Sequence, residues 1–117
     1  MGRTVLIVDD HAAFRASARA LLEKQGLEVV GEAETGAAGL RAAVELAPDL
    51  VLLDVQLPDL DGFDVAARLA ELAAESAVVL ISSRDSSEFG SLVRESGARG
   101  FLPKAEISAA RIRALLG

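Results

Sequence analysis

The sequence predicts a doubly wound parallel α/β fold, in which one five-stranded sheet carries helices on both faces. Two observations favour this fold. Five short apolar runs alternate with five segments of helical periodicity. The run at residues 50–53, Leu-Val-Leu-Leu, is unbroken and is bounded by Pro48 and Pro58, as is typical of a strand buried on both faces. The 117 residues suit one domain, which we expect to span residues 1–117.

The first strand and helix are predicted at residues 4–8 and 12–25. The strand segment is rich in β-branched residues. The helix segment is expected to end at Gly26, and its apolar positions recur on one face, at Phe14, Ala18, Leu21 and Leu22.

The next strand, at residues 27–33, is interrupted by Glu28, Gly31 and Glu32, so we expect it near a sheet edge. Thr35 follows as the cap of a helix that ends before Pro48 and turns Leu40 and Val44 inward. The central strand is predicted at residues 50–54.

The second half of the chain continues the alternation. A helix is predicted over residues 63–74, with Val65, Leu69 and Leu72 on one stripe, and strands at 77–82 and 100–103. Between these strands, residues 87–96 form a marginal helix because Gly90 lies inside it. The last helix begins at Ser108, with Ile107 and Ile112 spaced as a hydrophobic staple.

Composition excludes several classes of function. The net charge of −6 disfavours direct binding of nucleic acid, and the absence of cysteine excludes disulfides and thiolate metal sites. The first residues meet acids too early for a signal peptide, and no apolar stretch is long enough to span a membrane. We therefore expect a cytoplasmic protein.

The unusual polar residues follow the ends of predicted strands. They are Asp9, Asp10, Asp54, Ser82 and Lys104. Because parallel strands end at the same edge of a sheet, these side chains should gather there, where open α/β folds bind ligands. Three carboxylates that converge repel one another, and a hard cation such as Mg²⁺ would relieve that repulsion.

This constellation, with the segments DDHAAFR and GARGFLPK and the loop LPDLDG, resembles the receiver (CheY-like) domain of bacterial two-component response regulators. Within that family it is most similar to the LuxR/NarL-type branch. The resemblance covers essentially the whole chain, and it implies a flavodoxin-like sheet of order 2-1-3-4-5.

The resemblance also implies a phosphorylation switch, and no enzyme beyond self-phosphorylation and self-dephosphorylation. Asp54 would accept a phosphoryl group from a sensor histidine kinase or phosphotransfer protein. Asp10, Asp54 and the backbone carbonyl of Gln56 would ligate Mg²⁺, with Asp9 acting partly through water. Lys104 and Ser82 would contact the phosphoryl group.

Further roles follow from the same resemblance. Ser82 and Phe101 would report the state of the site to the surface formed by the fourth helix, the fifth strand and the fifth helix. That surface is a candidate for homodimerisation and for an output partner that the sequence does not name. Gln56 and Arg84 would set the lifetime of the phosphoryl group.

Two features depart from the family pattern. Pro103 precedes Lys104 and Ala105 follows it, so a cis peptide after the lysine is not expected. Ser83 stands where the family prefers alanine. His11 is interpreted as solvated, and Asp59 and Asp61 as loop and capping acids.

Three other interpretations compete with a phosphorylated receiver domain. A haloacid-dehalogenase-like hydrolase needs a second acid two residues after its nucleophile, where Gln56 stands. A flavin-binding flavodoxin needs a phosphate-binding loop after the first strand, where Asp9 and Asp10 stand. The remaining alternative is a receiver-like interaction module that acts without phosphorylation.

Overall fold

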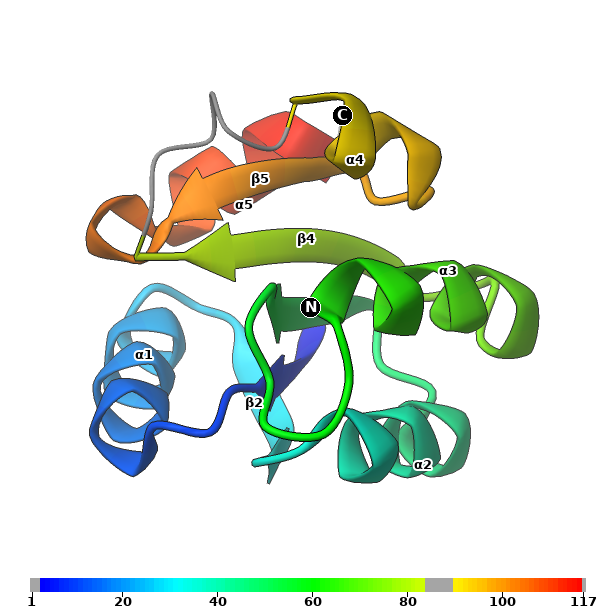
Figure 1. The fold of residues 1–117 in the computed structure, drawn as a ribbon. Coiled ribbons are helices and arrows are strands. Elements are labelled where there is room, and N and C mark those ends of the chain that lie inside the picture. Colours follow the sequence, from blue (N-terminus) through cyan, green and yellow to red (C-terminus); the bar gives the residue numbers. More distant parts are fainter. Residues whose placement is uncertain (1–2, 84–89, 117) are drawn as a thin grey trace.

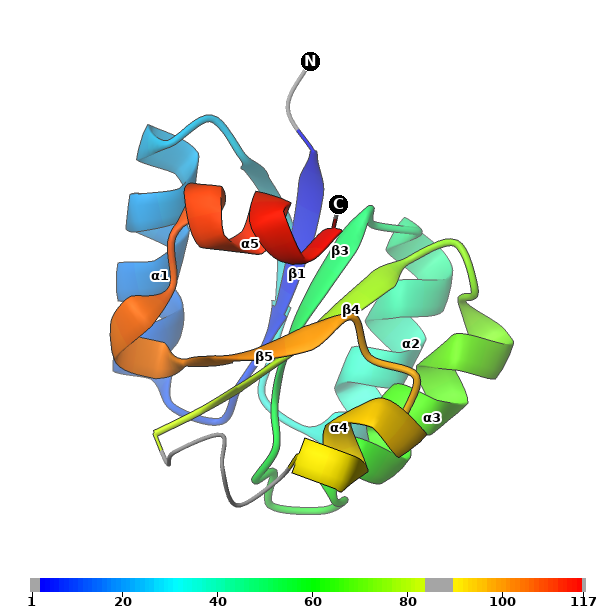
Figure 2. The same ribbon diagram turned by 90° about the horizontal axis from the view of Figure 1, so that it is seen from above.

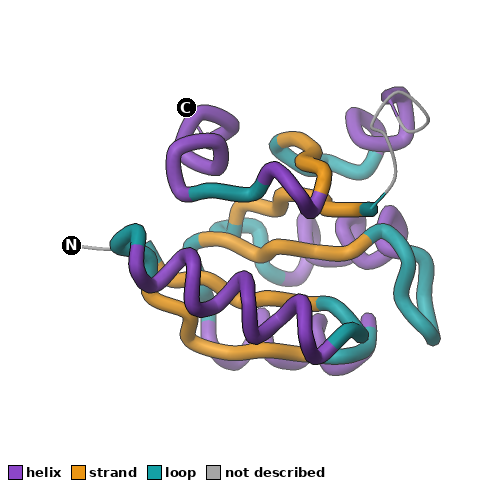
Figure 3. The backbone as a smooth tube through the Cα atoms, turned by 90° about the vertical axis from the view of Figure 1, so that its left-hand side faces the viewer, coloured by secondary structure: helices purple, strands orange, loops and turns teal. Residues whose placement is uncertain are grey.

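The computed structural model describes residues 3–83 and 90–116, and it has the predicted α/β fold. Strands and helices alternate along the described chain through short loops (Figure 3). The strands form one central layer, with helices on both of its faces (Figure 1). Among the described residues, no helix combines the length and the apolar character that crossing a membrane requires.

The sheet is wholly parallel, and its strands lie in the order β2-β1-β3-β4-β5. The predicted edge position of the second strand is therefore confirmed. The strands are β1 (Thr4–Val8), β2 (Glu28–Ala33), β3 (Leu50–Asp54), β4 (Ala77–Ser82) and β5 (Gly100–Pro103). Every residue of the central strand β3 is buried.

Five α-helices cover this sheet in the part of the chain that the structure describes. They are α1 (Ala12–Lys24), α2 (Gly36–Leu46), α3 (Gly62–Leu72), α4 (Gly90–Glu95) and α5 (Ala109–Leu116). A single turn of 3-10 helix, Lys104–Glu106, follows β5. The N-terminal part of the helix predicted at 87–96 lies outside the described residues, as does Arg84.

The two faces of the sheet have separate hydrophobic cores. Helices α1 and α5 pack on one face, whereas α2, α3 and α4 cover the other (Figure 2). The alternation of β1 shows the division, because Val5 and Ile7 belong to the first core and Leu6 and Val8 to the second.

Two predicted inward residues are exposed instead. Val44 is 55% exposed and Leu72 is 61% exposed. The buried positions of α2 are small residues, Gly36, Gly39 and Ala43, so the helix lies close against the sheet and Val44 falls outside the contact. Leu72 is the last residue of α3, where the helix leaves the core.

The predicted capping side chains lie at the helix ends and accept hydrogen bonds from backbone N–H groups there. Thr35 Oγ1 accepts a hydrogen bond from the N–H of Ala38 at 3.1 Å, and Asp61 caps α3 by accepting from Phe63 N at 2.8 Å. Gly26 has a φ of 95° beyond the end of α1, in the region that favours glycine.

Candidate functional site

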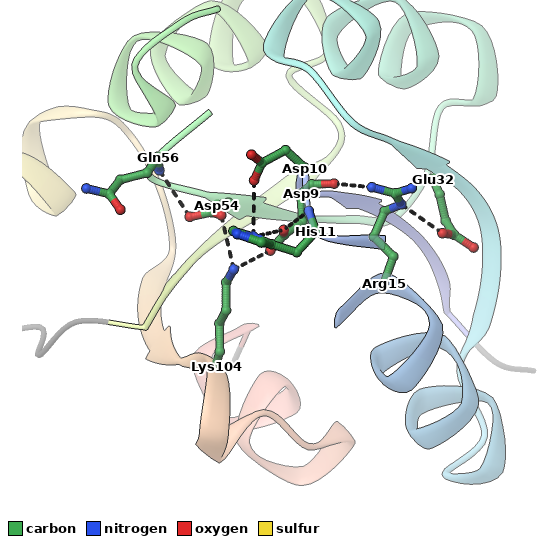
Figure 4. A network of polar contacts seen from close by, with 8 residues as sticks. All are labelled: Asp9, Asp10, His11, Arg15, Glu32, Asp54, Gln56 and Lys104. Carbon is green, nitrogen blue, oxygen red and sulfur yellow. Dashed lines mark hydrogen bonds and ion pairs between the residues drawn. The ribbon is translucent and has the colours of Figure 1, made fainter. Parts of the chain in front are cut away.

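The carboxyl ends of four neighbouring strands bring the predicted polar residues together. Asp9 directly follows β1, Asp54 is the last residue of β3, Ser82 is the last residue of β4 and Lys104 directly follows β5. Asp9, Asp54 and Ser82 are buried. Figure 4 shows the acids and the lysine converging on one point.

Lys104 is the centre of the ion pairs. Its Nζ lies 2.6 Å from Asp9 Oδ2 and 3.1 Å from Asp54 Oδ2, and it stands 4.7 Å from the centroid of the Phe14 ring on α1. Burial by itself lowers the pKa of Lys104, but the contacts with Asp9 and Asp54 outweigh burial and raise the pKa above its ordinary value. The lysine is therefore held protonated beside the two acids.

Asp54 combines burial with a fixed orientation. Its Oδ1 accepts a hydrogen bond from the backbone N–H of Gln56 at 3.0 Å, while its Oδ2 faces Lys104. Burial raises the pKa of Asp54 and outweighs the Gln56 N–H and the Lys104 ammonium, both of which lower it. The carboxylate is thus costly to ionise until more positive charge reaches the site.

The loop after β1 arranges the other two acids around His11. Asp9 Oδ1 accepts from the backbone N–H of His11 at 2.8 Å and lies 3.0 Å from its Nδ1. The same Nδ1 is 3.1 Å from Asp10 Oδ1. The His11 ring is 66% exposed, as its interpretation as a solvated residue requires, but it also touches both acids.

The donor set suits a hard divalent cation. One ligand atom from each of Asp9, Asp10, His11 and Asp54 lies within 4.8 Å of the others. Asp9 Oδ2 is buried, and within the described part of the chain its charged partner is Lys104 Nζ at 2.6 Å. A cluster of carboxylates with an exposed member, Asp10, fits Mg²⁺, which prefers oxygen ligands and keeps waters.

The loop between β3 and α3 is tied to both neighbouring helices. Asp59 accepts hydrogen bonds from the first N–H groups of α2, Gly36 at 2.7 Å and Ala37 at 3.0 Å. These bonds lower the pKa of Asp59. Gln56 forms an isolated bridge with Asp61, and its side chain extends away from Lys104 (Figure 4). Asp59 and Asp61 thus have the capping roles predicted for them.

Phe101 belongs to the second hydrophobic core. It is partly buried on β5 and packs against the core that α3 and α4 cover. Its strand neighbour on β4 is Leu80, two residues before Ser82. Phe101 therefore lies on the face of the sheet that α3 and α4 cover.

Two residues that contact the site were not among the site residues predicted from the sequence. Phe14 lies beneath the Lys104 ammonium. Arg15 donates from Nη1 to the backbone oxygen of Asp9 at 2.5 Å and from Nε to Glu32 at 3.0 Å. Their only sequence signal is their position, in the first turns of the helix that follows the acid pair.

Solved structures of receiver domains share the fold of this chain. The signal receiver domain of the response regulator NarL from Mycobacterium tuberculosis superimposes with a TM-score of 0.86 at 36% identity, covering 99% of this chain and 98% of that one. A LuxR-family two-component response regulator from Aurantimonas sp. SI85-9A1 gives a TM-score of 0.89 at 27% identity, covering 100% and 87%.

Two sequence relatives agree with the structural match. BvgA of Bordetella pertussis, named as a positive transcription regulator of virulence factors, is 43% identical over 106 residues, which are 91% of this chain and 51% of BvgA. The chemotaxis protein CheY of Bacillus subtilis is 33% identical over 104 residues, 89% of this chain and 87% of CheY.

This chain spans about half the length of BvgA and of a transcriptional regulator from Pseudomonas aeruginosa, which is 41% identical to it. The family model of the response regulator receiver domain matches residues 5–116, which are nearly the whole chain. The chain therefore belongs to the receiver domain family of the two-component response regulators.

Proposed function

We propose that Asp54 accepts a phosphoryl group from a phosphohistidine on a sensor histidine kinase or phosphotransfer protein. Receiver domains are the signalling switches of two-component systems and are not classical enzymes. The observation that carries the assignment to Asp54 is its position: a buried carboxylate at the end of the central strand, with Lys104 Nζ 3.1 Å from its Oδ2.

In the transfer step, a carboxylate oxygen of Asp54 forms a bond to phosphorus as the P–N bond of the phosphohistidine breaks. The electron pair of that bond stays on the imidazole nitrogen, and an aspartyl phosphate results. Lys104 carries the positive charge that offsets the charge of the transferring group. The hydrogen bond from Gln56 N to Oδ1 holds the carboxylate in place.

Asp9, Asp10 and Asp54, with the backbone carbonyl of Gln56, would hold Mg²⁺ next to the acceptor. The ion supplies charge neutralisation for the transferring phosphoryl group. Three clustered acids with one lysine leave an excess of negative charge at this edge, which is the electrostatic reason to expect a divalent cation there.

The signal would leave the site through β4 and β5. We propose that the Ser82 hydroxyl hydrogen-bonds a phosphoryl oxygen and that Phe101 responds by changing its packing against the α4 side of the sheet. The surface of α4, β5 and α5 would then bind an output partner or a second copy of the chain. Gln56 and Arg84 remain the residues proposed to set the phosphoryl lifetime.

The partners follow from the same proposal. We expect no direct contact of this domain with nucleic acid, because its net charge is −6. Since transcription regulators such as BvgA are about twice as long, any DNA binding would belong to a further part of a longer protein. The cytoplasm is the compartment that we propose for a phosphotransfer partner of a sensor kinase.

The mass of the intact protein tests this function. After incubation with a small phosphodonor and Mg²⁺, the protein should gain one phosphoryl group, and the gain should disappear without Mg²⁺ or in Asp54→Asn. If the folded protein gains nothing from the donor or from a cognate kinase, the proposal is wrong. The phosphorylation-independent interaction module then becomes the better account.

A further inference from the structure

Arg15 joins the site to the edge strand of the sheet through one guanidinium group. Its Nη1 donates to the backbone oxygen of Asp9 at 2.5 Å, and its Nε donates to Glu32 Oε1 on β2 at 3.0 Å. The side chain is 15% exposed, so the contact is largely shielded from water. Figure 4 shows Arg15 between the two partners, on the side of Asp9 away from Lys104.

We propose that Arg15 is a positioning residue that sets the orientation of the Asp9–Asp10 peptide and, through it, the separation of the two carboxylates that face a divalent cation. This inference rests on the proposed function, because it concerns the same Mg²⁺ site. The backbone oxygen that Arg15 contacts belongs to the peptide that links the two acids, so the guanidinium acts on both of them at once.

The preceding peptide group, which joins Val8 to Asp9, is held by a hydrogen bond to β2. Asp9 N donates to Ala33 O of β2 at 2.9 Å, which orders the chain as it leaves β1. Without Arg15, the oxygen on the other side of Asp9 would have no protein donor among the described residues. Among the described residues, the turn into α1 would then keep the side-chain contacts of Asp9 and Asp10 with His11 and the bond from Arg15 N to His11 O, none of which involves the Asp9 oxygen.

Glu32 holds the guanidinium in this orientation. It also binds Arg19, whose Nη1 lies 2.8 Å from Glu32 Oε2. The hydrogen bond from Arg19, and then that from Arg15, lowers the pKa of Glu32 and keeps the carboxylate ionised. A planar guanidinium with several fixed donors can bridge a carboxylate and a carbonyl together, which a lysine cannot do with the same geometry.

A purely electrostatic role of Arg15 and a positioning role predict opposite effects of its replacement on the affinity for a divalent cation. Removal of a positive charge near a cation site should strengthen cation binding by simple electrostatics. Loss of positioning should weaken it, since groups that orient metal ligands typically contribute 10- to 100-fold to affinity. The sign of the change therefore separates the two roles.

Arg19→Gln is the matched control. Arg19 shares Glu32 with Arg15 and also contacts the backbone oxygen of Val29 at 3.3 Å, but no contact joins it to Asp9 in the described part of the chain. It lies on the same helix and carries the same charge. Its replacement repeats the loss of charge and of a Glu32 partner, and leaves the Asp9 backbone contact in place.

Titration of the metal-free protein with Mg²⁺ by calorimetry gives the test, with amide NMR as a second readout. Arg15→Gln should raise the Kd for Mg²⁺ roughly tenfold and shift the Asp10 and His11 amide signals before any metal is added. Arg15→Lys should also weaken binding. Arg19→Gln should stay within about twofold of wild type and leave those amide signals unmoved.

The outcomes separate this inference from the proposed function. A wild-type protein that binds no Mg²⁺ overturns both. Wild-type binding with an unchanged or tighter Arg15→Gln overturns the positioning role alone, as does full recovery in Arg15→Lys or equal weakening by Arg19→Gln. If Arg15→Gln does not fold, Glu32→Gln provides the same comparison, with weaker Mg²⁺ binding expected and unchanged binding contradicting the role.

Discussion

Lys104 Nζ and Asp54 Oδ2 lie 3.1 Å apart although the two residues are separated by 50 positions in the chain. The parallel sheet brings them together, because β3 and β5 both end at the same edge and β4 lies between them. Asp9 lies 2.6 Å from the same ammonium. One lysine therefore links the ends of β1 and β3, and its charge is shared between two buried acids.

Lys104→Ala should slow phosphoryl uptake by Asp54 on the order of 100-fold, the effect typical of removing one preorganised charge from a transfer site. The rate of mass gain with a small phosphodonor measures it. Lys24→Ala is the matched control, because Lys24 is exposed in the last turn of α1. Equal rates for Lys104→Ala and wild type would make Lys104 an ordinary surface residue.

Asp54→Asn should be more stable than wild type near neutral pH when no divalent cation is present. Burial raises the folded-state pKa of Asp54, so ionisation of the carboxylate destabilises the folded protein as the pH rises through that pKa. Below it the wild-type carboxyl is neutral too, and the advantage of the asparagine should shrink. Urea unfolding of both proteins across acid and neutral pH measures this, and a less stable asparagine variant near neutrality would contradict it.

Gly62→Ala should destabilise the domain by about 1–3 kcal/mol, the usual cost of overpacking. A Cβ at this first residue of α3 would collide with the backbone oxygen of Asp54 and lie 2.5 Å from Val55 Cα. Gly90→Ala is the control, since the nearest atom, Arg94 Nη1, would be 4.0 Å away. Equal stability of the two variants in urea would show that α3 does not need this close approach.

Asp59→Ala should lower stability near neutral pH and should lose this effect in acid. Asp59 has a lowered pKa because the N–H groups of Ala37 and Gly36 bind its ionised form. Its contribution is present above the unfolded-state pKa and disappears as the pH falls through the folded-state pKa. Glu71→Ala removes an exposed acid on α3 that forms no ion pair within the described part of the chain, and it should show little change. If Asp59→Ala lowered stability equally at every pH, the ionised carboxylate of Asp59 would not be what stabilises the start of α2.

The fold was predictable because the patterns are local. An unbroken apolar run at residues 50–53 is enough to identify a buried strand, and β3 is the central strand. Periodicity does not say which strands are neighbours, so the order came from the family resemblance. The acids after β1 and β3 and the lysine after β5 were predictable for a similar reason, since each directly follows or ends a recognisable strand.

The side-chain positions that were predicted wrongly, or not predicted, depend on how closely the helices and strands pack, which the sequence pattern does not show. Leu40 and Val44 were expected to face inward on α2, and Leu40 does pack against the second core. The fully buried positions of the helix are small, however, and a Cβ at Gly39 would lie 2.8 Å from Val8 Cγ1. Val44 is therefore displaced outward. Arg15 was missed because its partners are a backbone oxygen six residues away and Glu32, 17 residues away, which no helical pattern reveals.

Chemical localisation of the phosphoryl group tests the central claim most directly. Borohydride reduces an aspartyl phosphate to homoserine, so treatment of the phosphorylated protein followed by peptide mass mapping identifies the acceptor. Homoserine at position 54, and only in protein treated with phosphodonor and Mg²⁺, is the predicted result. Homoserine at position 9 or 10, or none in protein that has gained a phosphoryl group, would show that Asp54 is not the acceptor.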